Sequence, residues 1–176
     1  MITSPFRLLL VALTLTMAPS ASMTAQTTPV ALIPADIDRL TGAPWRGTLE
    51  YLDYTSQKQV TIKSTLAVRR LPAQSDGATA WSMAVGYTDE PDANSGETAL
   101  LSADGRTFRG EAVQERSVDP AGTLRIVTEQ DGPDDNRPAR FRFVYLIGPA
   151  TLSIQKLVRF APTDAFFERH IYRWSR

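Results

Sequence analysis

The chain has 176 residues, with 19 basic and 19 acidic side chains and no cysteine. A formal net charge of zero excludes the large basic field that attracts nucleic acids or anionic membranes, so we predict no nucleic-acid partner. Without cysteine there are no disulfides and no thiol chemistry, and the fold must depend on a hydrophobic core. This length suits a single domain, and 43% hydrophobic residues are ordinary for a globular protein.

Residues 1–22 have the three parts of a secretory signal peptide. Arg7 supplies a positive charge, residues 8–17 are apolar and uncharged, and small residues follow up to Ser22. The apolar stretch is too short to span a bilayer, and no second run of sufficient length follows it. We therefore expect export to a bacterial periplasm or the medium, with no integral membrane segment after signal removal. An uncleaved N-terminal anchor is the alternative.

The next segments form a lead and a short helix. Residues 23–33 contain Thr and Pro and predict a flexible lead. Residues 34–40 predict one or two helical turns, because Pro34 suits a first helical position and Gly42 suits a helix end. We expect one domain over residues 34–176.

From residue 45 onward the sequence alternates apolar and polar side chains in short runs separated by turn signals. In one run, Phe141, Phe143 and Tyr145 share a face while Arg140 and Arg142 point the other way. We expect a longer loop over residues 131–136. The predicted strands are residues 45–54, 59–71, 79–88, 97–103, 106–118, 123–130, 139–147, 150–160 and 165–175.

Short connections force neighbouring strands to pair, and closure removes the exposed edges of such a sheet. The predicted fold is therefore all-β: a single antiparallel up-and-down β-barrel of about eight to ten strands with a short N-terminal helical turn. A sandwich is the alternative. The interior of a barrel of this size is either filled by side chains or holds one small ligand.

The segment Gly42-Ala-Pro-Trp45-Arg-Gly47, placed after a short helical turn, resembles the opening of calycin-type barrels. Its Trp-x-Gly spacing is similar to the start of nitrobindin-like and other lipocalin-like barrels. The resemblance implies a barrel that binds an apolar molecule, with Trp45 closing one end. Nitrobindins hold haem through a histidine near the C-terminal strand, so the resemblance also implies haem on His170, the single histidine.

The last predicted strand carries the sharpest candidate site. Glu168, His170 and Tyr172 share the more aromatic face, which we expect to point inward, with Glu168 hydrogen-bonded to the His170 ring. A structural histidine bonded to a buried tyrosine or backbone group is the alternative. Other aromatic residues either line a pocket or form close-packed core. The candidate ligand contacts are Trp45, Tyr51, Trp81, Tyr145, Glu168, His170 and Tyr172.

No enzyme signature is present: there is no nucleophile elbow, no His-Glu-x-x-His pair and no phosphate loop. The acidic loops lack the alternating spacing of calcium loops, and we predict no metal site. The sequence favours a secreted or periplasmic protein that binds a small apolar or amphipathic molecule in a barrel lumen. One alternative is a filled barrel that serves as an envelope structural or protein-interaction module, with no partner specified. Another is a hydrolase or isomerase that uses Glu168 and His170 as acid and base.

Overall fold

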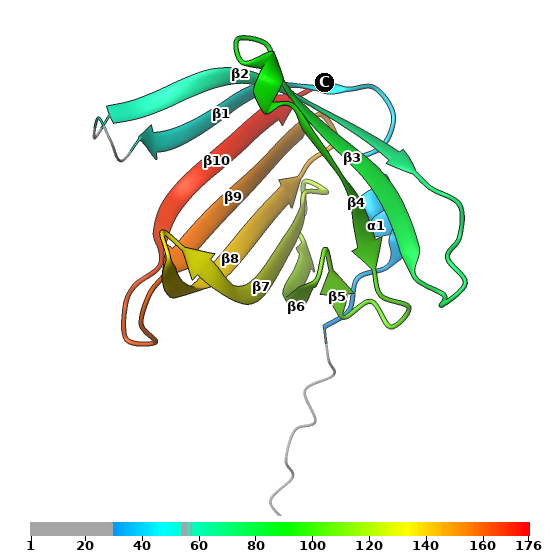
Figure 1. Cartoon of the computed structure of the whole chain (residues 1–176). Helices are drawn as coiled ribbons and strands as arrows, with labels where there is room; N and C mark the ends of the chain where they lie inside the picture. Colours follow the sequence, from blue (N-terminus) through cyan, green and yellow to red (C-terminus); the bar gives the residue numbers. More distant parts are fainter. Residues whose placement is uncertain (1–29, 54–55, 57) are drawn as a thin grey trace, which may run out of the picture.

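The computed structural model describes residues 30–53, 56 and 58–176. Within them, ten antiparallel strands close into a barrel in the order β1-β10-β9-β8-β7-β6-β5-β4-β3-β2 (Figure 1). The prediction of an all-β, up-and-down barrel with a short N-terminal helical turn is confirmed. The predicted signal peptide and most of the predicted flexible lead lie outside the described residues. The elements are α1 (Pro34–Asp38), β1 (Trp45–Asp53), β2 (Lys58–Arg70), β3 (Thr79–Tyr87), a 3₁₀ turn η1 (Pro91–Ala93), β4 (Ser95–Leu101), β5 (Thr107–Phe108), β6 (Glu111–Val118), β7 (Leu124–Asp134), β8 (Arg137–Ile147), β9 (Thr151–Arg159) and β10 (Phe167–Ser175).

The first and last strands meet at a seam that closes the barrel. β1 pairs with β10 from Arg46↔Ser175 to Tyr51↔His170. Gly47 lies opposite Trp174, and the two backbones approach so closely there that a Cβ on Gly47 would lie 1.9 Å from the Arg173 carbonyl oxygen. The glycine of the Trp-x-Gly opening is therefore required by the closeness of the seam.

One end of the barrel is closed by α1, whose side chains contact Arg70 of β2, Trp81 of β3 and Arg116 of β6. Trp45 is fully buried there, and its indole Nε1 donates a hydrogen bond to the Leu40 carbonyl at 2.9 Å. Trp81, also fully buried, donates to Asp38 Oδ1 at 2.9 Å. The buried Asp36 accepts two hydrogen bonds from the Arg116 guanidinium, at 2.8 and 2.7 Å. Apolar packing and these polar contacts together hold α1 in place. We refer to α1 as the plug of the barrel.

Two predicted elements differ from the observed ones. The predicted strand 106–118 is divided into β5 and β6 by a tight turn in which Arg109 and Gly110 have φ of +57° and +80°. The predicted loop 131–136 is mostly strand, because Asp135 and Asn136 adopt left-handed φ of +50° and +59° and turn the chain within two residues. The sequence pattern missed the first turn and predicted too long a loop at the second, since neither carries the usual Asn-Gly or Asp-Gly pair.

Strand pairing around the barrel is most limited beside the β5–β6 turn. β4 pairs with β5 only at Leu101↔Phe108, and β6 pairs with β7 only as far as Ala112↔Glu129. Among the described residues, the part of β4 that precedes Leu101 is therefore paired only with β3, and the part of β7 that follows Glu129 is paired only with β8. Arg109 lies at this point, with its backbone N–H donating to the Leu100 carbonyl at 2.8 Å.

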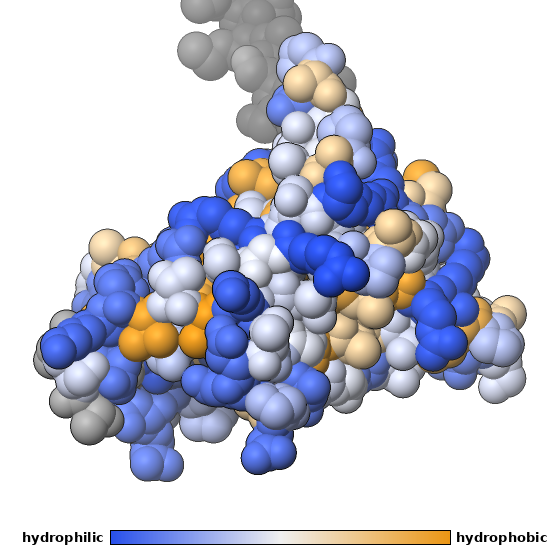
Figure 2. Space-filling model, turned by 90° about the horizontal axis from the view of Figure 1, so that it is seen from above, coloured by the Kyte–Doolittle hydropathy of each residue, from blue (hydrophilic) through white to orange (hydrophobic). Residues whose placement is uncertain are grey.

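The outer surface is mostly polar. Figure 2 shows one face, on which hydrophilic residues predominate and apolar ones occur in small separate groups. The large exposed hydrophobic side chains lie before α1 and on β4, β6, β8 and β10: Val30, Ile33, Leu100, Val118, Leu146 and Phe167. Among the described residues, no helix has the length and apolar character needed to cross a membrane.

Candidate functional site

A cavity of about 470 Å³ lies in the barrel lumen. Residues from β2, β3, β4, β8, β9 and β10 contribute to its wall, together with Arg109 from the β5–β6 turn. Its apolar wall is formed by Leu66, Met83, Val85, Phe143, Ile154 and Trp174, and its polar part by Ser95, Gly96, Glu97, Arg109, Lys156, His170 and Tyr172. An apolar concavity with a few convergent polar groups is the usual form of a small-molecule site.

Arg109 reaches the lumen because its left-handed backbone directs it away from the regular strand alternation. Its Nε lies 2.8 Å from Glu97 Oε1, in an ion pair without the alignment of a hydrogen bond. Its Nη1 donates to the Tyr145 hydroxyl at 3.0 Å, and its guanidinium lies 5.9 Å from the centre of the Phe143 ring. Although burial opposes it, the neighbouring Tyr145, Glu111 and Glu97 raise the pKa of Arg109, so the cation is permanent.

A buried polar network lies behind Arg109. Thr128 donates a short hydrogen bond to the Glu111 carboxylate, and the Tyr145 hydroxyl donates to the same oxygen at 3.3 Å. Burial raises the pKa of Glu111, and the charge of Arg109 opposes that shift. Burial also raises the pKa of Tyr145. These groups satisfy one another, so we interpret them as support that holds Arg109 in place.

Lys156 is the second cation of the cavity wall. It follows Leu152 and Ile154 on the inner face of β9. Its Nζ lies 3.9 Å from the centre of the Phe141 ring and 4.0 Å from Asp134 Oδ1. The same carboxylate oxygen is 3.4 Å from Arg169 Nε. Burial lowers the pKa of Lys156, and Arg169 adds to that shift while Asp134 opposes it.

His170 stands between these charges and the aromatic wall. Burial, with the positive charges of Lys156 and Arg169, lowers the pKa of His170 to about 4, while Asp134 opposes the shift. Its ring meets Tyr172 edge-on at 5.5 Å, and Tyr172 stacks on Trp174 at 4.6 Å. The hydroxyls of Tyr172 and Tyr87 are 2.6 Å apart. At neutral pH the imidazole is therefore uncharged and offers one donor and one acceptor.

Acid should destabilise the fold through His170. Because its folded pKa of about 4 lies below the usual 6.5, the unfolded chain takes up a proton first as the pH falls. The stabilising effect of the neutral ring is complete above pH about 6.5 and is lost toward pH 4, by up to about 3 kcal/mol. We expect His170→Gln to remove this part of the pH dependence. Urea denaturation of both proteins at pH 7.5 and 4.5 measures it, and parallel pH curves would contradict the assignment.

The structure places the predicted site residues in three settings. His170 and Tyr172 line the cavity, and Tyr145 lies buried behind Arg109. Trp45 and Trp81 do not line it, because both are fully buried against α1 at the closed end. Tyr51 pairs with His170 across the seam without lining the cavity.

The expected pairing of Glu168 with His170 is wrong. A β-bulge between these residues shifts the register of β10, so Glu168 faces Leu157 and His170 faces Lys156. Glu168 is exposed and accepts a hydrogen bond from Gln155 at 2.5 Å. One extra residue reverses the side-chain alternation, which is why simple period-two reading failed here. The acid–base pair of the enzyme alternative has no support in this geometry.

Three charged residues of the cavity were missed by the sequence reading: Glu97, Arg109 and Lys156. Lys156 had a detectable signal, since it shares a period-two face with Leu152 and Ile154. Arg109 precedes a glycine, which is a turn signal, but nothing local indicates that its side chain enters the lumen. Glu97 is brought in by strand pairing alone.

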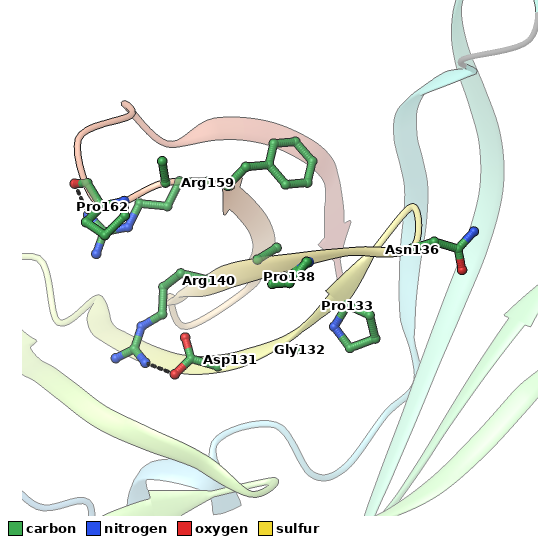
Figure 3. A pocket seen from close by; sticks show the side chains of 11 residues that line it. Asp131, Gly132, Pro133, Asn136, Pro138, Arg140, Arg159 and Pro162 are labelled. Carbon is green, nitrogen blue, oxygen red and sulfur yellow. Dashed lines mark hydrogen bonds and ion pairs between the residues drawn. The ribbon is translucent and has the colours of Figure 1, made fainter.

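A larger hollow of about 750 Å³ lies at the barrel rim, between the β7–β8 hairpin and the loop after β9. Figure 3 shows the ion pair of Asp131 with Arg140 on one side and Arg159 beside Pro162 on the other. Its lining also includes Pro133 and Pro138. This hollow is the more open of the two and its charged groups are engaged with each other or with the backbone, so the lumen is the better candidate site.

Comparison with protein-family models, curated proteins and solved structures gives no significant match. The closed ten-strand barrel is compatible with a calycin-like fold. Among residues 30–53, 56 and 58–176, no group of three or more His, Asp or Glu side chains is arranged to hold a metal ion. Haem bound through His170 stays a prediction.

Proposed function

We propose that this protein binds a small amphipathic molecule in the lumen of its barrel, as a lipocalin-like binding protein of the periplasm or the extracellular medium. The observation that carries the proposal is the lumen cavity of about 470 Å³, with its apolar wall and its few polar groups. Burial of ligand surface against that wall supplies the affinity, at roughly 25 cal/mol per Å² before the costs of association.

The closed end of the barrel and the limited strand pairing beside the β5–β6 turn support this proposal. The α1 plug seals one end with buried side chains, so water and ligand do not enter there. Beside the β5–β6 turn, the part of β4 that precedes Leu101 is paired only with β3, and Glu97 on this stretch is 46% exposed, so the cavity is accessible from this side. The mostly polar face in Figure 2 offers no broad apolar patch for a protein partner.

Filling the cavity tests the proposal. Val85 lies on its wall, and we expect Val85→Trp to abolish the binding of the neutral dye N-phenyl-1-naphthylamine, with a loss of stability of about 1–3 kcal/mol from overpacking. The matched control is Leu146→Trp, which adds the same side chain at a position that is 39% exposed on β8. Fluorescence titration of the full chain and both variants is the measurement. No saturable binding, or equal binding by all three proteins, would favour the filled barrel that acts as an interaction module.

A further inference from the structure

The charges that face the cavity are not balanced within its wall. Glu97, Arg109 and Lys156 are its charged lining residues, and His170 is neutral. Glu97 is engaged by Arg109 at 2.8 Å. The lining therefore carries one cation more than it has carboxylates, and that cation is Lys156.

The ammonium of Lys156 is poorly satisfied by the protein. Its ion-pair partner is Asp134, whose Oδ1 lies 4.0 Å away, which is too long for a hydrogen bond. That carboxylate is closer to Arg169, at 3.4 Å. A lysine has three N–H donors, and among the described residues none of them reaches a hydrogen-bond acceptor. The Lys156 side chain is 20% exposed, so most of it lies inside the barrel.

The pKa values of Lys156 and of its neighbour His170 are both lowered in this part of the cavity. His170 pairs with Lys156 across β9 and β10, and its pKa is lowered by burial and by the charges of Lys156 and Arg169. Burial lowers the pKa of Lys156 itself. An anion in the cavity beside Lys156 would relieve both effects, since it favours the charged amine and offsets the repulsion.

We propose that the ligand of this lumen carries an anionic head group, a carboxylate, sulfonate or phosphate, which binds Lys156 while its apolar part lies against Ile154, Val85 and Met83. This inference rests on the proposed function and specifies its ligand class. Arg109 also lines the wall, but it is paired with Glu97, so Lys156 is the cation available to the head group. Hydrogen bonds to a charged group are the stronger ones, which makes the head group decisive for selectivity.

Two dyes with the same aromatic skeleton separate the head group from the apolar part. 8-Anilinonaphthalene-1-sulfonate has the sulfonate, and N-phenyl-1-naphthylamine lacks it. We expect the full chain to bind the sulfonate dye at least about tenfold more tightly, the effect of one charge-assisted hydrogen bond. We expect Lys156→Met to abolish that preference and to leave the affinity for the neutral dye within about twofold. Lys156→Arg should retain the preference because it keeps the charge.

The matched control is Lys63→Met, which removes one positive charge from an exposed position of β2 and should change neither affinity. Equal binding of both dyes by the unaltered chain overturns the proposal, and this comparison does not depend on how Lys156→Met folds. A loss of both affinities in Lys156→Met with an intact near-ultraviolet circular dichroism spectrum also overturns it. If instead neither dye binds, or Val85→Trp blocks neither, the proposed lumen function itself fails.

Discussion

Replacement of Gly47 with alanine is expected to be among the most damaging single substitutions in this barrel. An added Cβ would lie 1.9 Å from the Arg173 carbonyl oxygen and 2.8 Å from the Trp174 Cα. Both are backbone atoms, so no side-chain rotation relieves the clash and β1 must move away from β10. We expect a loss of about 3 kcal/mol or more in the free energy of unfolding, at the upper end of overpacking costs.

Urea denaturation followed by tryptophan fluorescence measures this loss, since Trp45, Trp81 and Trp174 are all buried. Gly96→Ala is the control within the same barrel. Its added Cβ would meet only the Met83 carbonyl oxygen, at an ordinary 3.6 Å, so its stability should be unchanged or slightly raised. Similar unfolding free energies for the two variants would show that the seam can widen without cost.

The second large effect is expected at the plug. Arg116→Ala would leave Asp36, which is 2% exposed, with a buried charge and only the Ile33 N–H as a hydrogen-bond donor. Breaking a buried ion pair from one side typically costs about 3–5 kcal/mol, and we expect about 3 because Arg116 itself is partly exposed.

The control is Arg70→Ala, which breaks the ion pair to Asp38 on the same helix. That pair is exposed, with 50% and 33% of its side chains accessible, and should contribute less than about 1 kcal/mol. Replacing Asp36 and Arg116 together by alanine should cost less than the sum of the single changes, because the uncompensated charge disappears. Thermal unfolding of the three single variants and the double variant measures these effects. Equal losses of stability for Arg116→Ala and Arg70→Ala would contradict a stabilising role for the buried Asp36–Arg116 pair.

The fold was predictable because its determinants are local. Alternation along β8 placed Phe141, Phe143 and Tyr145 on the inner face, and short connections imposed pairing of neighbours, as observed. Trp45, predicted both to close one end and to contact the ligand, lies at the closed end and does not line the cavity. Such patterns repeat over many residues, so a few errors do not change the outcome.

The site was less predictable because it depends on irregularities of single residues. The bulge before His170 moved Glu168 out of the lumen, and the left-handed turn at Arg109 brought a cation in. Neither event changes the hydrophobic pattern of its strand enough to be seen in the sequence. His170 and Tyr172, by contrast, lie beyond the bulge on a regular stretch of β10, and they were placed on the cavity wall.

The sequence by itself determined the class of fold, the short N-terminal helical turn and the alternation of the regular strands, because side-chain alternation and turn chemistry act over a few neighbouring residues. Only the tertiary structure decided which charges meet. Glu97, Arg109, Lys156 and His170 come from four different parts of the chain. Their juxtaposition follows from the closure and register of the whole barrel, and a long-range register is set by the sum of all strand pairings rather than by any one segment.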